Sequence, residues 1–425
     1  MTAKTLHSKK KKGGKIVLAA LLVVMVAVFG TVGFLALKLL DRLQVNPGGD
    51  APSNQYNLEE EEEDPFFETV YDITDATNLK NFLSQWWTNG GDGMIRYSKD
   101  VVNVLLIGVD NNDGEPGAGR SDSMMLASVN KKARKITLLS FLRDSYCYFE
   151  VNGEPYYNRL NTSYFYGGPA GLMEAISRLY KIRVDKYITV DFKSFPRLID
   201  ALGGVEVEVS KAEARYLNRN AKSVTRTLEE GLQHLDGTEA LAYSRIRTLD
   251  SDWNRTNRQQ KVIRSILTRA RGANLAQLYN ALEVTLDHVV TNYTRTELLG
   301  MIPPAMGWLG FEVAHMASPV IDYQDGDSNA IGGTINGMSI LIVDYPKAAQ
   351  QVQMALYGES NIDLQDDAHR NAYIEELFAG AAQRPHSSSA TRGGGAEAET
   401  TAPHGQPGWP FWPWGGGGEA QPITP

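Results

Sequence analysis

The sequence predicts an α/β protein in which helices cover both faces of a central mixed sheet, with one transmembrane helix before it. Between about residues 96 and 358, apolar runs of strand length alternate with segments of helical periodicity, which is typical of a sheet covered by helices. Near the N-terminus, residues 16–37 contain no charged residue. A helix over these 22 residues would be ~33 Å long at ~1.5 Å per residue, which is enough to cross a bilayer.

The residues around the apolar stretch predict its orientation. Residues 1–15 contain six lysines and no acid, so the positive-inside rule places this tail in the cytoplasm and the rest of the chain outside. A cleavable signal peptide is the alternative, but the stretch is longer than a signal peptide needs and no clear small-x-small cleavage site follows it. We therefore expect a single-pass helix over residues 16–40 that holds an extracytoplasmic body on a cell membrane.

Cysteine usage and charge narrow the class of protein. The chain has one cysteine, Cys147, which excludes an internal disulfide and a cysteine-based metal site. A body outside the cytoplasm that lacks disulfides fits a Gram-positive bacterium. From Leu39 onward the net charge is −15, since seven of the 42 basic residues precede it and all 50 acids follow it. Such an acidic body is a poor partner for nucleic acid.

The segments on either side of the main domain are predicted from composition and periodicity. Residues 41–95 form an extracytoplasmic linker, with a solvated stretch over residues 44–64 that ends in an acidic run. Residues 359–383 form a C-terminal extension, and the Gly-, Pro- and Trp-rich residues 384–425 are expected to be disordered. An accessory helix in the linker is predicted from apolar residues at i, i+3, i+4, i+7 and i+8, namely Leu79, Phe82, Leu83, Trp86 and Trp87.

Within residues 96–358, the first three strands are expected to run up, down and up. The first is an apolar run ended by the loop sequence DNNDGEPGAG, and a short polar turn joins the second to the third. Helices and strands then alternate. The predicted strands cover residues 101–109, 123–129, 135–142, 186–192 and 203–209, and the predicted helices cover residues 171–180 and 195–202.

Charged residues gather at one edge of this predicted sheet. Asp110 ends the first strand, Arg120 and Asp122 precede the second, and Arg143 and Asp144 follow the third. The up-down-up arrangement brings all of them to the same rim. A solvated ion-pair network is the alternative, but the glycine-rich sequence GAGRSD allows the backbone to approach a ligand closely.

A second basic cluster follows about a hundred residues later. Arg245 and Arg247 would share a face of an extended segment, while Arg255, Arg258 and Gln259 would share a face of a helix that begins near residue 254. A solvated basic face is the alternative. Carboxylates combined with arginines suit a phosphate group bound with a divalent cation, and this many groups fit a pyrophosphate better than a single phosphate.

Several motifs together resemble the LytR-CpsA-Psr family of cell-wall glycopolymer transferases. The resemblance is dense over residues 97–269 and extends to about residue 358. The chain departs from the family pattern at Leu142, where proline is usual, at SDWNR, where GDFGR is common, and at Ser123, where threonine is usual. The motifs occur in the family order and are NVLLIGVDNNDG, GRSDSMMLASVN, KITLLSFLRDS, YNRLNTSYFYGG, YITVDF, DALGGVEVEV, LDGTEALAYSRIR and NRTNRQQ.

The resemblance implies a phosphotransferase with an α/β/α sandwich fold and an apolar cavity for a polyprenyl chain. Its donor would be a glycopolymer, such as wall teichoic acid or capsule, on a polyprenyl-pyrophosphate carrier, and its acceptor a sugar hydroxyl of peptidoglycan. Asp110 and Asp122 resemble the residues that hold Mg²⁺ or Mn²⁺, and Asp110, Arg120, Asp122 and Arg143 resemble the catalytic set. The implied pyrophosphate-binding residues are Arg120, Arg143, Arg159, Arg245, Arg247, Arg255 and Gln259, with Arg159 standing where lysine is frequent.

Two other functions remain open from the sequence. A hydrolase would cleave the same pyrophosphate with water, and a non-catalytic adaptor or regulator of the cell envelope would bind it without reaction. The general base is also open between Asp122 and Asp144.

Overall fold

The protein is described here by a computed structural model. It describes residues 44–49, 71–89, 94–110, 120–191, 194–246, 249, 252–285, 289–308, 310–320, 328–367 and 369–382, all of which belong to one compact unit. The predicted basic tail, the membrane helix over residues 16–40, the acidic run and the C-terminal tail lie outside these residues. Within the described ranges, none of the helices combines the length and the apolar character needed to span a bilayer.

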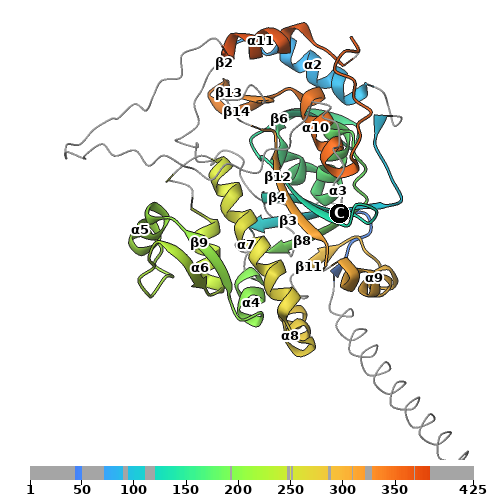
Figure 1. The fold of residues 1–425 in the computed structure, drawn as a ribbon. Coiled ribbons are helices and arrows are strands. Elements are labelled where there is room, and N and C mark those ends of the chain that lie inside the picture. The colour runs from blue at the N-terminus through green and yellow to red at the C-terminus, as the bar shows by residue number, and fades with distance from the viewer. Residues whose placement is uncertain are drawn as a thin grey trace, which may run out of the picture. The chain divides into compact units, whose positions relative to one another are not determined.

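A seven-stranded mixed sheet forms the centre of the described unit (Figure 1). In sheet order the strands are β1 (Gln44–Val45), β11 (Val289–Thr291), β8 (Lys186–Asp191), β3 (Val101–Asp110), β4 (Arg120–Asn130), β5 (Lys135–Phe141) and β12 (Glu312–Ser318). The three strands β3, β4 and β5 pair antiparallel, which confirms the predicted up-down-up arrangement. β8 runs parallel to β3, and β12 runs parallel to β5.

Helices pack on both faces of this sheet. On one face, alternate residues of β3, Leu105, Ile107 and Val109, join a large core with α3 (Leu160–Tyr180) and α10 (Tyr345–Tyr357). On the other face lie α4 (Ser194–Ala201) and α7 (Asp252–Gly272), as Figure 1 shows for α7. Because successive side chains of a strand point to opposite faces of the sheet, β3 presents apolar side chains to the helices on each face.

A second, smaller core lies beside α7. The strand β9 (Val205–Val209) alternates buried valines with exposed glutamates, and it pairs with β10 (Gly231–Leu235). Its valines pack with side chains of α5 (Lys211–Asn220) and α6 (Gly237–Ser244). Both helices begin with a capping box, at Ser210 and Asp236.

The remaining elements complete the chain. They are β2 (Tyr71–Ile73), α2 (Thr77–Thr88), β6 (Tyr146–Val151), β7 (Glu154–Arg159), α8 (Leu275–Thr285), α9 (Arg295–Trp308), β13 (Ala330–Ile335), β14 (Met338–Val343) and α11 (Ala372–Ala382).

The first described residues correct one prediction from the sequence. Residues 44–49, expected to be part of a solvated linker, instead belong to the folded unit because β1 pairs with β11. Asn46 accepts a hydrogen bond from the Tyr187 hydroxyl at 3.0 Å, and Gly49 accepts one from the Ala170 amide at 3.0 Å. The chain is thus fixed to the sheet edge directly after the predicted membrane helix.

The predicted accessory helix is confirmed as α2, and its five apolar residues are all buried. It is held by Lys181, whose ammonium donates hydrogen bonds to the carbonyls of Trp86 at 2.7 Å, Asn89 at 3.0 Å and Trp87 at 3.4 Å. These carbonyls belong to the last turn of α2 and to its C-cap, where a side-chain donor can take the place of the next turn's amides. Burial lowers the pKa of Lys181 to about 8, and repulsion from Arg178 adds to the shift.

Replacing Lys181 with methionine should lower the free energy of unfolding by about 1–3 kcal/mol, because buried carbonyls would lose their donor. Urea denaturation of the Lys181→Met variant measures this change. The exposed Lys222 provides the matched control, and Lys222→Met should unfold as wild type does. Equal stability of both variants would show that the ammonium does not stabilise the helix end.

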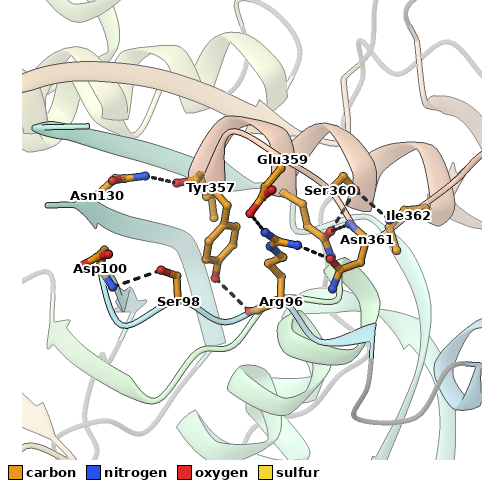
Figure 2. A network of polar contacts seen from close by, with 11 residues as sticks. Arg96, Ser98, Asp100, Asn130, Tyr357, Glu359, Ser360, Asn361 and Ile362 are labelled. Carbon is orange, nitrogen blue, oxygen red and sulfur yellow. Dashed lines mark hydrogen bonds and ion pairs between the residues drawn. The ribbon is translucent and has the colours of Figure 1, made fainter. Parts of the chain in front are cut away.

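The segment before β3 is tied to the end of α10 by a polar network (Figure 2). The Arg96 guanidinium donates to the side chains of Glu359 and Asn361. The Arg96 carbonyl accepts from the Tyr357 hydroxyl at 3.1 Å, and Asn103 donates to the same hydroxyl at 2.9 Å. This network stabilises the end of the sheet where β3 begins. Asp110 and the predicted rim lie at the other end of the same strand.

Candidate functional site

The predicted rim forms where β3 ends and β4 begins. Asp110 and Arg120 lie directly opposite each other in the antiparallel register. The register shifts between Val109, which faces Ser121, and Gly108, which faces Ser123, so Asp122 is the extra residue of a bulge. Arg120 and Asp122 therefore lie within β4. The sequence analysis placed both residues before this strand, and that prediction is wrong. Bulges of this kind frequently occur beside functional sites, where they redirect a side chain.

Three charged side chains meet near this rim, two from the turn after β5 and one from the end of β7. Asp144 Oδ2 lies 3.4 Å from Arg143 Nε, and Asp144 Oδ1 lies 3.5 Å from Arg159 Nη1. The three side chains are only 9–12% exposed, and burial lowers the pKa of Arg159. Placed in this way, the Asp144 carboxylate reduces the repulsion between two buried guanidinium groups.

Backbone contacts connect this ion cluster to the start of β4. The Ser121 hydroxyl donates to the Asn161 carbonyl at 3.4 Å, and the Asn161 amide donates to the Arg143 carbonyl at 3.3 Å. Ser121 stands between Arg120 and Asp122. The predicted convergence of these segments is therefore seen in the backbone, and the sequence RLN at the start of α3 belongs to the same site.

The helix α7 begins at Asp252, close to the predicted start at residue 254. Arg255 is buried, as a binding residue inside a cleft would be. Arg258 has a different role from the one predicted, because it donates to the Ile246 carbonyl at 2.8 Å and pairs with Glu213 at 3.5 Å. It therefore ties α7 to the smaller core, while Gln259 lines a cavity against the sheet.

The two arginines before α7 are only partly described. Arg245 caps α6 with φ −97° and ψ 2° and is exposed, so the extended conformation predicted for it is wrong. Arg247 lies outside the described residues.

An apolar cavity of about 270 Å³ separates the sheet from α4 and α7. It lies beside the rim, because Gly108 and Ser123 line it and Gln259 stands one turn after Arg255. Of the lining residues, Gln259 alone was predicted from the sequence to bind the ligand, although Ile263, Ile266 and Leu267 continue its helical face. The full lining is Leu106, Ile107, Gly108, Ser123, Met125, Val190, Phe195, Leu198, Ser244, Gln259, Ile263, Ile266 and Leu267.

The predicted metal site rests on Asp110 and Asp122. Among the residues whose side chains the structure describes, no group of three or more His, Cys, Asp or Glu side chains could hold a metal ion. The side chains of Asp110 and Asp122 are not among them. Their backbones lie on paired strands, two residues apart in register, and carboxylate oxygens are the donors that Mg²⁺ prefers, so the residue types fit the predicted cation.

Comparisons with known proteins identify the family of the chain. Residues 69–354 match the LytR_cpsA_psr family. TagV of Bacillus subtilis, a polyisoprenyl-teichoic acid–peptidoglycan teichoic acid transferase, is 27% identical over 54% of this chain and 58% of its own length. TagU of Bacillus licheniformis, with the same named activity, is 34% identical over 46% of this chain and 61% of its own length. The chain thus spans about three fifths of these relatives.

Solved structures show the same fold. The crystal structure of B. subtilis TagT has a TM-score of 0.50 and 23% identity, and the match covers 64% of this chain and 97% of that chain. A Streptococcus agalactiae protein has a TM-score of 0.52 and 23% identity, over 62% and 89% of the two chains. Since the family match covers more than half of the sequence, this mixed α/β protein belongs to the LytR_cpsA_psr family.

Proposed function

We propose that this protein transfers a glycopolymer from a polyprenyl-pyrophosphate carrier to a sugar hydroxyl of peptidoglycan and forms a phosphodiester. The observation that carries the proposal is an apolar cavity beside buried arginines, since a lipid pyrophosphate has an apolar chain joined to a dianionic head. The relatives TagU and TagV bear the name of the same reaction class, with teichoic acid as the polymer.

In this reaction the acceptor hydroxyl oxygen bonds to the phosphorus that carries the glycan. The bond from that phosphorus to the bridging oxygen breaks, and polyprenyl phosphate leaves. Arg120, Arg143, Arg159 and Arg255 would neutralise the phosphate oxygens, and Gln259 would orient the carrier at the cavity entrance. Asp110 and Asp122 would hold Mg²⁺ or Mn²⁺, which supplies further positive charge when bound. Arg245 and Arg247 complete the proposed binding set.

The contacts of Asp144 suit a role in positioning the arginines better than a role as general base. Its carboxylate already faces two guanidinium groups, at 3.4 and 3.5 Å. A carboxylate held in this way stabilises the arginines in the geometry that the pyrophosphate needs. The proton of the acceptor hydroxyl would then pass to Asp122, to a carboxylate oxygen that does not hold the cation.

Asp144→Asn should therefore weaken donor binding about tenfold or more, because a buried charged contact contributes roughly 1.5–3 kcal/mol. Titration of the variant with donor, together with its rate at saturating donor and its pH–rate profile, measures both effects. The rate at saturation should fall less than the affinity, and the acidic limb of the profile should remain. Normal affinity with a lost acidic limb would instead identify Asp144 as the base.

The cavity predicts a dependence on carrier length. Each buried methylene of the carrier should contribute about 0.8 kcal/mol, so narrowing the cavity should affect long carriers most. Ile263→Trp should weaken binding of a long polyprenyl donor about tenfold and leave a two-isoprene donor nearly unchanged. Thr268→Trp, on the exposed side of the same helix, is the control. Equal affinity of Ile263→Trp for both donors would contradict a cavity that holds the lipid.

We also propose that residues 16–40 span the membrane, with residues 1–15 in the cytoplasm and the body outside. The apolar, uncharged sequence and the preceding lysines support this. The protein would also have the three-layer sandwich fold of the family. The helices that pack on both faces of the sheet support this proposal.

A further inference from the structure

Three consecutive residues of α7 point in three directions. Successive side chains of an α-helix lie about 100° apart around its axis. Arg258 faces the smaller core, where it donates to the Ile246 carbonyl, and Gln259 lines the cavity. Gln260 faces the sheet and is only 5% exposed. The cavity side of the helix therefore has a buried polar contact on each side of it.

The Gln260 amide connects α7 to two neighbouring strands. Its Nε2 atom donates to the Ser140 hydroxyl of β5 at 3.0 Å and to the Met316 carbonyl of β12 at 2.9 Å. Ser140 is buried, and the residues on either side of it, Leu139 and Phe141, belong to the core on the other face of the sheet. Because side chains alternate along a strand, Ser140 points to the α7 face. A single side chain thus fixes the helix to both strands.

These hydrogen bonds do more than fill space. A buried amide is unfavourable unless its polar atoms are hydrogen-bonded, and a leucine or methionine would fill a similar volume without that cost. An apolar side chain, however, would allow the helix to turn or slide on the sheet. Hydrogen bonds depend on direction as well as distance. The two bonds of Gln260 therefore define how α7 is rotated against β5 and β12.

The strand that Gln260 contacts also leads to the rim. Ser140 lies three residues before Arg143, a member of the buried ion cluster at the rim. On the helix, Gln260 directly follows Gln259 and lies five residues after the buried Arg255. The contact therefore joins the two parts of the proposed pyrophosphate site, one carried by the strand and one by the helix.

Small rotations of α7 would have large effects on this site. A helix with its side chains has a radius of about 5–6 Å, so a rotation of about 20° moves the tip of a side chain by about 2 Å. A misplacement of about 1 Å can lower the rate of an enzyme about 100-fold. Gln260 does not line the cavity, so its effect on the donor has to pass through Arg255 and Gln259.

We propose that Gln260 is a positioning residue, which holds α7 in the rotation that directs Arg255 and Gln259 towards the pyrophosphate of the donor. The inference rests on the proposed function and deepens it. It assigns a role to the second glutamine of the sequence RQQ, whereas the resemblance to the family implied a role for the first.

The test uses Gln260→Met, which keeps the length of the side chain and removes both hydrogen bonds. Calorimetric titration of the full chain with polyprenyl pyrophosphate in Mg²⁺ should show about tenfold weaker binding, and the rate at saturating donor should also fall about tenfold. The pH–rate profile should keep its shape because no titrating group is lost. Gln85→Met, on the exposed side of α2, is the matched control and should equal wild type in each measurement.

A double-mutant cycle separates positioning from a purely structural role. Arg255→Ala should weaken donor binding about tenfold in the wild-type background but less than about threefold in Gln260→Met, because a misdirected guanidinium contributes little there. Equal losses in the two backgrounds would overturn the proposal. Wild-type donor affinity and rate in Gln260→Met would overturn it as well.

A milder variant gives the same information if Gln260→Met does not fold. Ser140→Ala removes one of the two acceptors and should weaken donor binding about threefold. Affinity equal to wild type would contradict the role of Gln260. These titrations need no acceptor, so they are independent of turnover. A wild type that binds no donor would contradict the proposed function itself, whereas normal wild-type binding with equal losses in the cycle contradicts only the positioning role.

Discussion

Asp110→Ala should reduce formation of the glycan–phosphate–peptidoglycan product by about 10³-fold or more, even when donor saturates the variant. Phosphoryl transfer depends on positioning and on neutralising charge at the reacting phosphate, so a lost metal ligand reduces turnover as well as affinity. Asp110 is paired in register with Arg120 at the end of β3, so both groups stand at the rim. Arg120→Ala should have a comparable effect for the same reason.

The product can be measured by the amount of labelled donor glycan that becomes attached to peptidoglycan fragments. Asp100→Ala is the matched control, because Asp100 immediately precedes β3 at the opposite edge of the sheet. It should react as wild type does. Wild-type product formation by donor-saturated Asp110→Ala would rule out the catalytic role of this carboxylate and favour an adaptor that only binds the carrier.

Arg255→Ala should weaken donor binding about tenfold or more. The guanidinium is buried near the first turn of α7, and a buried contact between an arginine and a phosphate contributes roughly 1.5–3 kcal/mol. Calorimetric titration with polyprenyl pyrophosphate in Mg²⁺ gives the change directly. Removing the cation should weaken wild-type binding too, because the proposed carboxylates Asp110 and Asp122 would then repel the pyrophosphate.

A control arginine lies on the same helix. Arg269 pairs with Glu206 at 2.8 Å on the surface, so Arg269→Ala changes the net charge equally without touching the cleft. It should bind donor with wild-type affinity. If Arg255→Ala and Arg269→Ala bind equally well, the buried arginine does not hold the pyrophosphate. Arg258→Ala is unsuitable for this comparison, since it would also break the contact between α7 and the smaller core.

The fold could be predicted where local sequence decides the element. The five buried residues of α2 and the alternating valines of β9 followed directly from their periodicity. The strand predicted over residues 203–209 starts two residues later in the structure. β9 begins at Val205 because Gly203 and Gly204 adopt φ of 82° and 83°. The first half of α3 was not predicted because the Gly168–Pro169 pair resembles a break, although the helix continues across a kink there.

Features that depend on distant pairing could not be read from the sequence. β1 has two residues in a Gly- and Asn-rich stretch, and its partner β11 lies about 245 residues later. For the same reason, the helical spacing grouped Arg258 with Arg255 and Gln259 and gave no sign that Glu213, 45 residues earlier, would pair with it. The charged site residues were found because several of them gather at the same end of three neighbouring apolar strands, whereas the cavity lining has the apolar composition of an ordinary core.

The most direct test of the proposed function combines the full chain with a lipid-linked oligosaccharide, Mg²⁺ and peptidoglycan fragments. A covalent conjugate in which the oligosaccharide is joined to a peptidoglycan sugar through a phosphodiester, with release of polyprenyl phosphate, is the predicted result. Release of free glycan phosphate without any conjugate would instead identify a hydrolase. Donor that binds and remains intact, with neither product formed, would contradict catalysis altogether.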